Sequence, residues 1–196
     1  MPLSRDTYET VPCGLSPAEI FAKADAFSVE ERFKGTMSGA LIAGSLGGKV
    51  EQIDQRAGMT MGGPLSDSDN CELVIGEDHF TVRLSQSHMA GTPRASFIVA
   101  QCVGHFILHV PTVKERYGHA ARILVRSRPT TDNEALCQTE AQLFATRLLA
   151  PPDRLAFEWN RAKGSLVKLR AVLGMPAENI IGLLGATFAT KSATLA

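Results

Sequence analysis

The residues best suited to chemistry lie in one apolar stretch of the chain, Arg94 to His109. Within it Gln101, His105 and His109 recur every four residues, which places them along one face of a helix. The residues between them are too apolar for a helix at the surface. A buried polar side chain without a hydrogen bond or a metal costs about 1–3 kcal/mol. The stretch therefore predicts a buried helix whose polar face meets polar partners elsewhere in the chain.

The frame Gln101-Cys102-Val103-Gly104-His105 has the spacing of the zinc-binding helix His-Glu-x-x-His. In that motif the two histidines bind the metal, and the glutamate acts as general base on the metal-bound water. Here the second histidine is present as His105, but Gln101 replaces the first histidine and Cys102 replaces the glutamate. An amide is a poor zinc ligand beside an imidazole, and a thiol does not copy a carboxylate base. The frame predicts the position of a catalytic centre that has lost its chemistry.

A second block, Thr139 to Pro151, reads Thr-Glu-Ala-Gln-Leu-Phe-Ala-Thr-Arg-Leu-Leu-Ala-Pro. In this order and at this separation, the two blocks resemble the ImmA/IrrE family of small zinc metallopeptidases. The family's helix commonly reads Arg-Phe-Thr-Leu-Ala-His-Glu-Leu-Gly-His-Tyr-Leu-Leu-His, and its second run reads Glu-Ala-Asn-x-Phe-Ala-x-x-Leu-Leu-Met-Pro. The resemblance covers about Gly35 to the C-terminus but is strong only in the two blocks. The matching positions in the first block are Arg94, Ala100, Gly104, His105, Leu108 and His109.

The resemblance implies a role for each matching residue. Gln101, His105 and Glu140 stand at the family's three metal-ligand positions, and Cys102 stands at the general-base position. Losing one ligand weakens metal binding, and losing the base removes a factor of about a hundred or more in rate. The resemblance thus implies a degenerate zinc site, empty or weak, and an inactive peptidase. The structural motif positions are Arg94, Gly104 and His109.

The two blocks also leave other interpretations of the cysteines open. Cys102 and His105 are three residues apart, as are Cys137 and Glu140, so the four could hold a closed structural zinc site. Both cysteines could instead be ordinary buried side chains, as free cysteines often are. A Cys102 nucleophile assisted by His105 is a third interpretation. We expect no cofactor, with zinc as the alternative.

Composition limits the functional class. The chain has 196 residues, 44% of them hydrophobic, and no net charge, which indicates an ordinary domain without a bulk attraction to nucleic acid or membrane. A local basic excess between Lys114 and Arg128 leaves direct nucleic-acid binding as a weaker hypothesis. No apolar run approaches the roughly 20 residues of a membrane span, and no signal-peptide pattern opens the chain. We expect a cytoplasmic protein with reduced cysteines, and its oligomeric state stays open.

Local patterns predict an α+β fold, a mostly helical zincin-like domain with a small antiparallel sheet packed on the motif helix. Residues 1–34 are expected to be a lead-in and a helix, and residues 35–196 a single metallopeptidase-type domain. Residues 112–130 are predicted as loop and strand edge, and Asp153 as the cap of a short helix. The predicted helices are Ser16–Phe33, Met37–Leu46, a helix begun by Thr92 and Pro93, Asp132–Leu149, and two between Leu166 and Phe188; the predicted strands are Lys49–Ile53, Cys71–Ile75, His79–Leu84 and Ile123–Val125.

Members of the resembled family cut or bind a helix-turn-helix repressor, in phages, other mobile elements or stress responses. The first functional hypothesis is therefore a pseudo-metallopeptidase that binds such a repressor through the former substrate cleft. The alternative is an active zinc endopeptidase with an unusual site, in which Gln101 or His109 replaces the missing ligand.

Overall fold

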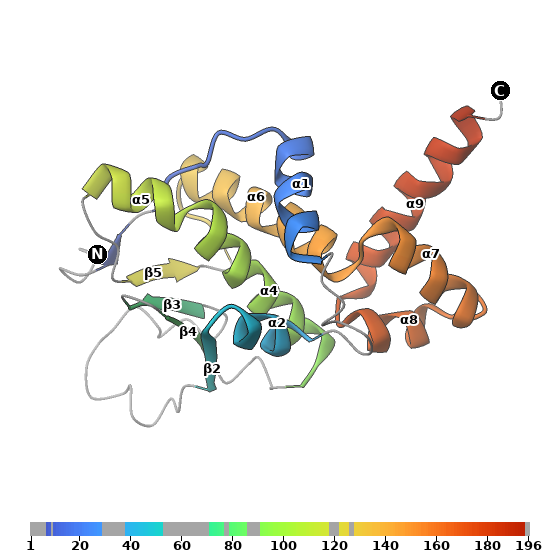
Figure 1. The fold of residues 1–196 in the computed structure, drawn as a ribbon, viewed down its shortest axis with the longest axis horizontal. Helices are drawn as coiled ribbons and strands as arrows, with labels where there is room; N and C mark the ends of the chain where they lie inside the picture. Colours follow the sequence, from blue (N-terminus) through green and yellow to red (C-terminus); the bar gives the residue numbers. More distant parts are fainter. Residues whose placement is uncertain are drawn as a thin grey trace.

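The computed structural model describes residues 7–8, 10–28, 38–52, 71–76, 79–85, 91–117, 122–125 and 128–194, and the fold is α+β as predicted (Figure 1). The segment Ala57 to Asn70, whose glycine, serine and aspartate residues predict a loop, lies outside these residues. The helices are α1 (Pro17–Ser28), α2 (Gly39–Ser45), α4 (Pro93–Leu108), α5 (Val110–Tyr117), α6 (Asp132–Leu149), α7 (Pro152–Arg161), α8 (Leu166–Leu173) and α9 (Ala177–Thr194). The strands are β1 (Thr7–Tyr8), β2 (Gly48–Gln52), β3 (Cys71–Ile75), β4 (Phe80–Leu84) and β5 (Arg122–Val125).

The strands form one mixed sheet in the order β1-β5-β3-β4-β2. The β3–β4 pair is the antiparallel hairpin that the sequence predicts, with Phe80, Val82 and Leu84 buried on one face of β4. The predicted purely antiparallel sheet is wrong, because β2 pairs parallel to β4 and β1 pairs parallel to β5. Parallel neighbours need a long connection, and residues 53 to 79 join β2 to β4 by way of β3.

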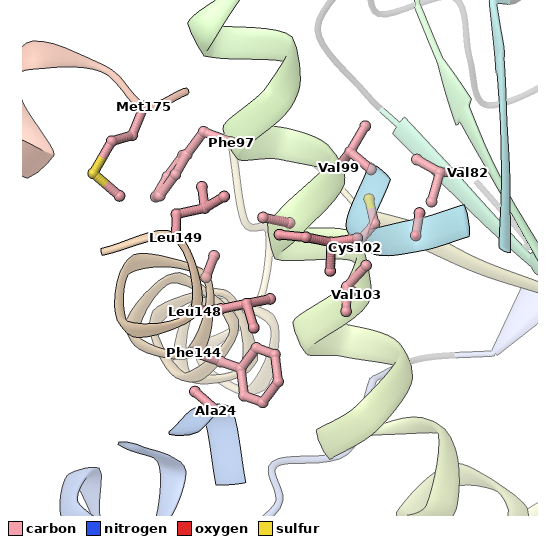
Figure 2. Close-up of a cluster of buried hydrophobic side chains, with 14 of the residues drawn as sticks. Ala24, Val82, Phe97, Val99, Cys102, Val103, Phe144, Leu148, Leu149 and Met175 are labelled. Atoms are coloured by element: carbon pink, nitrogen blue, oxygen red, sulfur yellow. The ribbon is translucent and has the colours of Figure 1, made fainter. Parts of the chain in front are cut away.

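Helix α4 lies in the middle of the molecule, between the sheet and α6 (Figure 1). On its sheet side Cys102 packs near Val82, while Phe97 faces the end of α6, near Leu149 (Figure 2). The ring of Phe106 stacks on Phe80 of β4 with centroids 4.3 Å apart. Burial on both sides explains why this helix is apolar almost all round.

The start of α4 follows its predicted cap. Thr92 Oγ1 accepts a hydrogen bond from Ala95 N at 3.2 Å, and Pro93 occupies the first turn, where its missing N–H costs nothing. The pair Val110-Pro111 is expected to stop the helix, but the chain only bends by 41° at His109, and α5 begins at Val110. The loop predicted from residue 112 is therefore wrong as far as Tyr117, since a proline is well tolerated in a first helical turn.

Among the described helices, none is by itself long and apolar enough to cross a membrane, although α4 and α5 satisfy that criterion as a bent pair.

Helix α1 is fixed to α6 by an ion pair. The sequence Ser16-Pro17-Ala18-Glu19 has the pattern of a capping box, and in the structure Ser16 N and Ser16 Oγ both donate to Glu19 Oε2, at 2.8 and 2.7 Å. The guanidinium of Arg147 on α6 donates two hydrogen bonds to the carboxylate of Asp25, at 2.7 and 2.6 Å. This two-pronged geometry is the strong form of an ion pair. The described helix ends at Ser28, and the predicted extension to Phe33 lies outside the described residues.

The C-terminal helices α7, α8 and α9 form the end of the molecule remote from β1 (Figure 1). Gly174 ends α8 in the left-handed conformation, with φ of 64°, as the predicted break before Pro176 requires. Asp153 does not cap α7 as predicted, because the N-cap is Pro151 and Asp153 lies in the first turn, where its charge suits the helix dipole.

Candidate functional site

The polar face of α4 meets α6 through a short chain of hydrogen bonds. His109 Nδ1 lies 3.0 Å from His105 Nδ1, and His109 Nε2 lies 2.8 Å from Glu140 Oε2. The three side chains are buried, with exposed fractions of 3% for His105, 0% for His109 and 5% for Glu140. His109 is thus the link between the other two, and it is His109 rather than His105 that touches the carboxylate.

The direction of each hydrogen bond follows from the carboxylate. Burial opposes ionisation of Glu140, but the hydrogen bonds from His109 and from the Cys13 N–H outweigh it and lower the pKa of the carboxyl. An ionised carboxylate only accepts, so His109 Nε2 donates. In a singly protonated imidazole His109 Nδ1 then accepts from His105 Nδ1–H. Burial, reinforced by the neighbouring His109, lowers the pKa of His105 well below its ordinary value, so this ring is neutral.

With the ring protons placed in this way, one buried nitrogen keeps a lone pair that accepts no hydrogen bond from the described residues. His105 Nε2 has no hydrogen-bond partner among the described residues. A buried polar atom without a partner costs about 1–3 kcal/mol, and such atoms are uncommon in folded proteins. The histidine pair is therefore held at an energetic cost, which the packing of α4 against α6 offsets.

A residue from the N-terminal segment completes the cluster. Cys13 N donates to Glu140 Oε2 at 3.1 Å, across 127 positions of sequence. Burial raises the pKa of the Cys13 thiol, and a backbone hydrogen bond from Leu15 partly offsets it. The segment has a second contact nearby, because the Val11 carbonyl lies 3.2 Å from Thr112 Oγ1, whose single proton it shares with the His109 carbonyl at 2.7 Å. The sequence carries no signal for this contact, since Cys13 belongs to no motif.

Cys102, at the general-base position of the resembled family, faces the other way. Its side chain is fully buried on the sheet side of α4, near Val82 (Figure 2). Burial, together with the neighbouring Cys71, raises its pKa well above the ordinary value, so it remains a protonated thiol. This position suits the interpretation of an ordinary buried cysteine and does not favour a thiolate nucleophile assisted by His105.

The remaining predicted ligands are only partly brought together. Gln101 is half-buried on α4, one turn before His105. Among the residues that the structure describes, one group of His, Cys, Asp or Glu side chains has all its possible metal-binding atoms within 4.8 Å of one another. It consists of Cys13, His109 and Glu140. The set Gln101, His105 and Glu140 is a weak zinc centre by its chemistry, because an amide occupies one position, while the unpartnered Nε2 of His105 keeps the lone pair that a metal would need.

The alternative structural set is not assembled either. Cys102 lies on the sheet side of α4, away from Cys137 and Glu140 on α6. Burial raises the pKa of Cys137 to about 11, partly countered by a hydrogen bond with Thr10 of the N-terminal segment. Cys102 and His105 on α4, like Cys137 and Glu140 on α6, are three residues apart, but the orientation of α4 about its axis directs Cys102 to the sheet and not to α6. All four cysteines are free, in accord with the predicted reduced thiols.

Of the three motif positions that the resemblance marks as structural, Gly104 has the clearest role. A Cβ at this position would lie 3.0 Å from the carbonyl oxygen and 3.1 Å from the Cα of Ala141 on α6. The glycine thus permits the close approach of α4 and α6 that brings His109 to Glu140. Arg94 is exposed in the first turn of α4, and His109 is the link already described.

The chain matches no protein-family model and none of the curated proteins with which it was compared.

The acid response of the protein tests the assignment of Glu140. Because its pKa in the folded state is below the ordinary 4.5, the carboxylate stabilises the fold above that pH, and the contribution disappears as pH falls through the lowered value. We expect Glu140→Gln to lower the free energy of unfolding at neutral pH and to have a shrinking effect below about pH 4.5. Urea titrations in the presence of a chelator measure it, with exposed Glu115→Gln as control. An effect of Glu140→Gln that persists unchanged in acid would contradict the assignment.

Proposed function

We propose that this chain is a catalytically inactive, zincin-like relative of the ImmA/IrrE metallopeptidases that regulates transcription by binding a protein partner. The observation that supports it most is the 2.8 Å contact of Glu140 Oε2 with His109 Nε2. This contact places Glu140, from the second block of the resemblance, against the histidines of the first block. Such closeness is required if the two blocks once supplied ligands to one metal site. The Glu140 carboxylate, which in the resembled family would bind the metal, is instead hydrogen-bonded to His109.

The absence of peptidase activity follows from the residues at the centre. Metal-assisted hydrolysis needs ligands that leave an open position for water, and a base within reach of that water. Gln101 offers an amide where the first imidazole should be, and the thiol of Cys102 is buried on the wrong side of α4. These features disfavour the alternative of an active endopeptidase.

The resemblance points to a helix-turn-helix repressor as the partner, in a phage, another mobile element or a stress response, and to the cytoplasm as the compartment. Direct binding of nucleic acid receives little support. The net charge is zero, and within the basic stretch Arg122 is paired with Glu72 at 2.9 Å. A chain that held DNA through this stretch would need those cations free for phosphates.

We place the partner on the C-terminal helices, in place of the former substrate cleft that the sequence hypothesis named. Each carries a large exposed apolar side chain, namely Phe157 on α7, Val167 on α8 and Ile181 on α9, with exposed fractions of 63%, 76% and 58%. Exposed aromatic and aliphatic side chains on neighbouring helices are the usual anchors of a protein interface. Leu41 on α2 is equally exposed, at 63%, but lies on a different part of the molecule and serves as a matched control.

The proposal is tested by mixing the purified chain with purified helix-turn-helix repressors of its own organism. We expect a stable complex in size-exclusion chromatography with light scattering, and no cleaved product with or without a chelator. Phe157→Ser should weaken the complex by about tenfold, as for an interface anchor, while Leu41→Ser should leave it unchanged. Repressor cleavage that a chelator abolishes would contradict the proposal and support the active endopeptidase.

A further inference from the structure

The cluster around Glu140 joins three ligand types from three parts of the chain. The Cys13 thiol, a ring nitrogen of His109 and a carboxylate oxygen of Glu140 all lie within 4.8 Å of one another. Cys13 comes from the segment before α1, His109 from the end of α4 and Glu140 from α6. A thiolate, an imidazole and a carboxylate together are a donor set that suits zinc.

The three groups are already held near the positions that a metal needs. Zinc bonds of about 2.0–2.3 Å to sulfur, nitrogen and oxygen place tetrahedral ligands roughly 3–4 Å apart. His109 Nε2 lies 2.8 Å from Glu140 Oε2, the Cys13 thiol is hydrogen-bonded to the Glu140 carboxylate, and all three ligand atoms lie within 4.8 Å of one another. An ion could take the place of the shared proton after small side-chain movements.

The surroundings supply both support and access. His105 Nδ1, 3.0 Å from His109 Nδ1, orients the imidazole from behind, as partners of metal-bound histidines usually do. His109 is completely buried and Glu140 nearly so, whereas Cys13 is only half-buried. The thiol of Cys13 is therefore the most accessible of the three ligands, and an ion that enters from its side can reach the buried His109 and Glu140.

We propose that Cys13, His109 and Glu140 bind a zinc-class divalent cation that pins the N-terminal segment onto the α4–α6 pair. The site joins three parts of the chain, and its fourth tetrahedral position would be left to a solvent molecule. It differs from the set that the resemblance implies, since Cys13 and His109 replace Gln101 and His105. It is also independent of the proposed repressor binding, which can fail while the metal site holds, or hold while the metal site fails.

Binding has a definite proton balance. The Cys13 thiol loses its proton, while His109 gives up its Nε2 proton to free the lone pair for the metal. His109 Nδ1 takes the proton that His105 Nδ1 had donated, and His105 is reprotonated at the lone pair of Nε2. The two imidazoles together keep two protons, so one proton is released for each ion bound.

The test uses the full chain, reduced, stripped of metal and titrated with Co²⁺ and then Zn²⁺. We expect one Co²⁺ for each chain, tetrahedral visible absorption, a thiolate-to-cobalt charge-transfer band in the near ultraviolet, and loss of both when Zn²⁺ displaces cobalt. A pH-indicator titration should show one proton released. Cys13→Ser should abolish the charge-transfer band and weaken binding by at least about tenfold, the scale of losses around metal sites.

Two control variants keep the assignment specific. Cys137→Ser removes a buried thiol of the same region, and Gln101→Ala removes the amide of the resembled family's set; both should keep the metal and its spectrum. His109→Gln tests the imidazole, with circular dichroism to verify the fold. The proposal is overturned if the wild-type chain binds neither ion at micromolar concentration. It is equally overturned if the band survives Cys13→Ser, or if Gln101→Ala loses the metal while Cys13→Ser keeps it.

Discussion

Gly39→Ala is expected to destabilise the protein strongly, whereas Gly44→Ala on the same helix should stabilise it. A Cβ on Gly39 would collide with the carbonyl oxygen of Ser96 and lie 2.8 Å from Val99 Cβ and 3.0 Å from Ala100 N. Most of these atoms belong to the backbone or root of α4, so they cannot move aside as the tip of a side chain could. Overpacking of this kind costs about 1–3 kcal/mol, or more where the backbone must shift.

The contact that Gly39 permits is a specific one. Its N–H donates to Ser96 Oγ at 2.7 Å in a buried position, so α2 is bonded to α4 as well as packed on it. If α2 must move away to accommodate a methyl group, this hydrogen bond is lost with the close packing. The donor and the acceptor would then be buried without partners, which adds to the cost.

The matched substitution Gly44→Ala meets open space, because no atom lies within 4 Å of the added Cβ. Replacing a helical glycine by alanine there should stabilise the fold by about 0.5–1 kcal/mol, through a smaller loss of backbone freedom. Urea denaturation of both variants measures the two free energies of unfolding. Equal effects of the same sign would mean that α2 does not pack on α4 through Gly39.

His109→Leu is expected to destabilise the protein by about 1.5–3 kcal/mol, because the buried Glu140 carboxylate loses the hydrogen bond from its imidazole partner. The leucine fills much of the same space, so the loss comes chiefly from a buried carboxylate with one hydrogen bond fewer. Adding Glu140→Gln to this variant should recover a large part of the lost stability. The amide carries no charge and still accepts the hydrogen bond from Cys13 N.

A double-mutant cycle in a chelating buffer measures this coupling and keeps it apart from any contribution of metal. His79→Leu is the control, since that histidine is exposed before β4 and its loss should have little effect. Strictly additive effects of His109→Leu and Glu140→Gln would refute a direct link between the two side chains. A large effect of His79→Leu would show that the loss of a histidine is damaging wherever it lies.

Sequence patterns alone determined the features that depend on neighbours in the chain. The capping box at Ser16 and Glu19, the Thr92 cap and the density of apolar residues in α4 each act within a few residues, and each is present in the structure. The i,i+4 spacing correctly placed His105 and His109 on one face of that helix. The alternation in β4 fixed its buried face in the same way.

Only the tertiary structure decided which of these side chains meet. The rotation of α4 between the sheet and α6 turns Cys102 to the sheet and sends His109, not His105, to Glu140. The approach of Cys13 depends on a fold that brings together residues 127 positions apart. Such contacts have no sequence period, because helix rotation and chain crossings are set by the packing of the whole core. The same reason explains why the parallel pairing of β2 with β4 was missed.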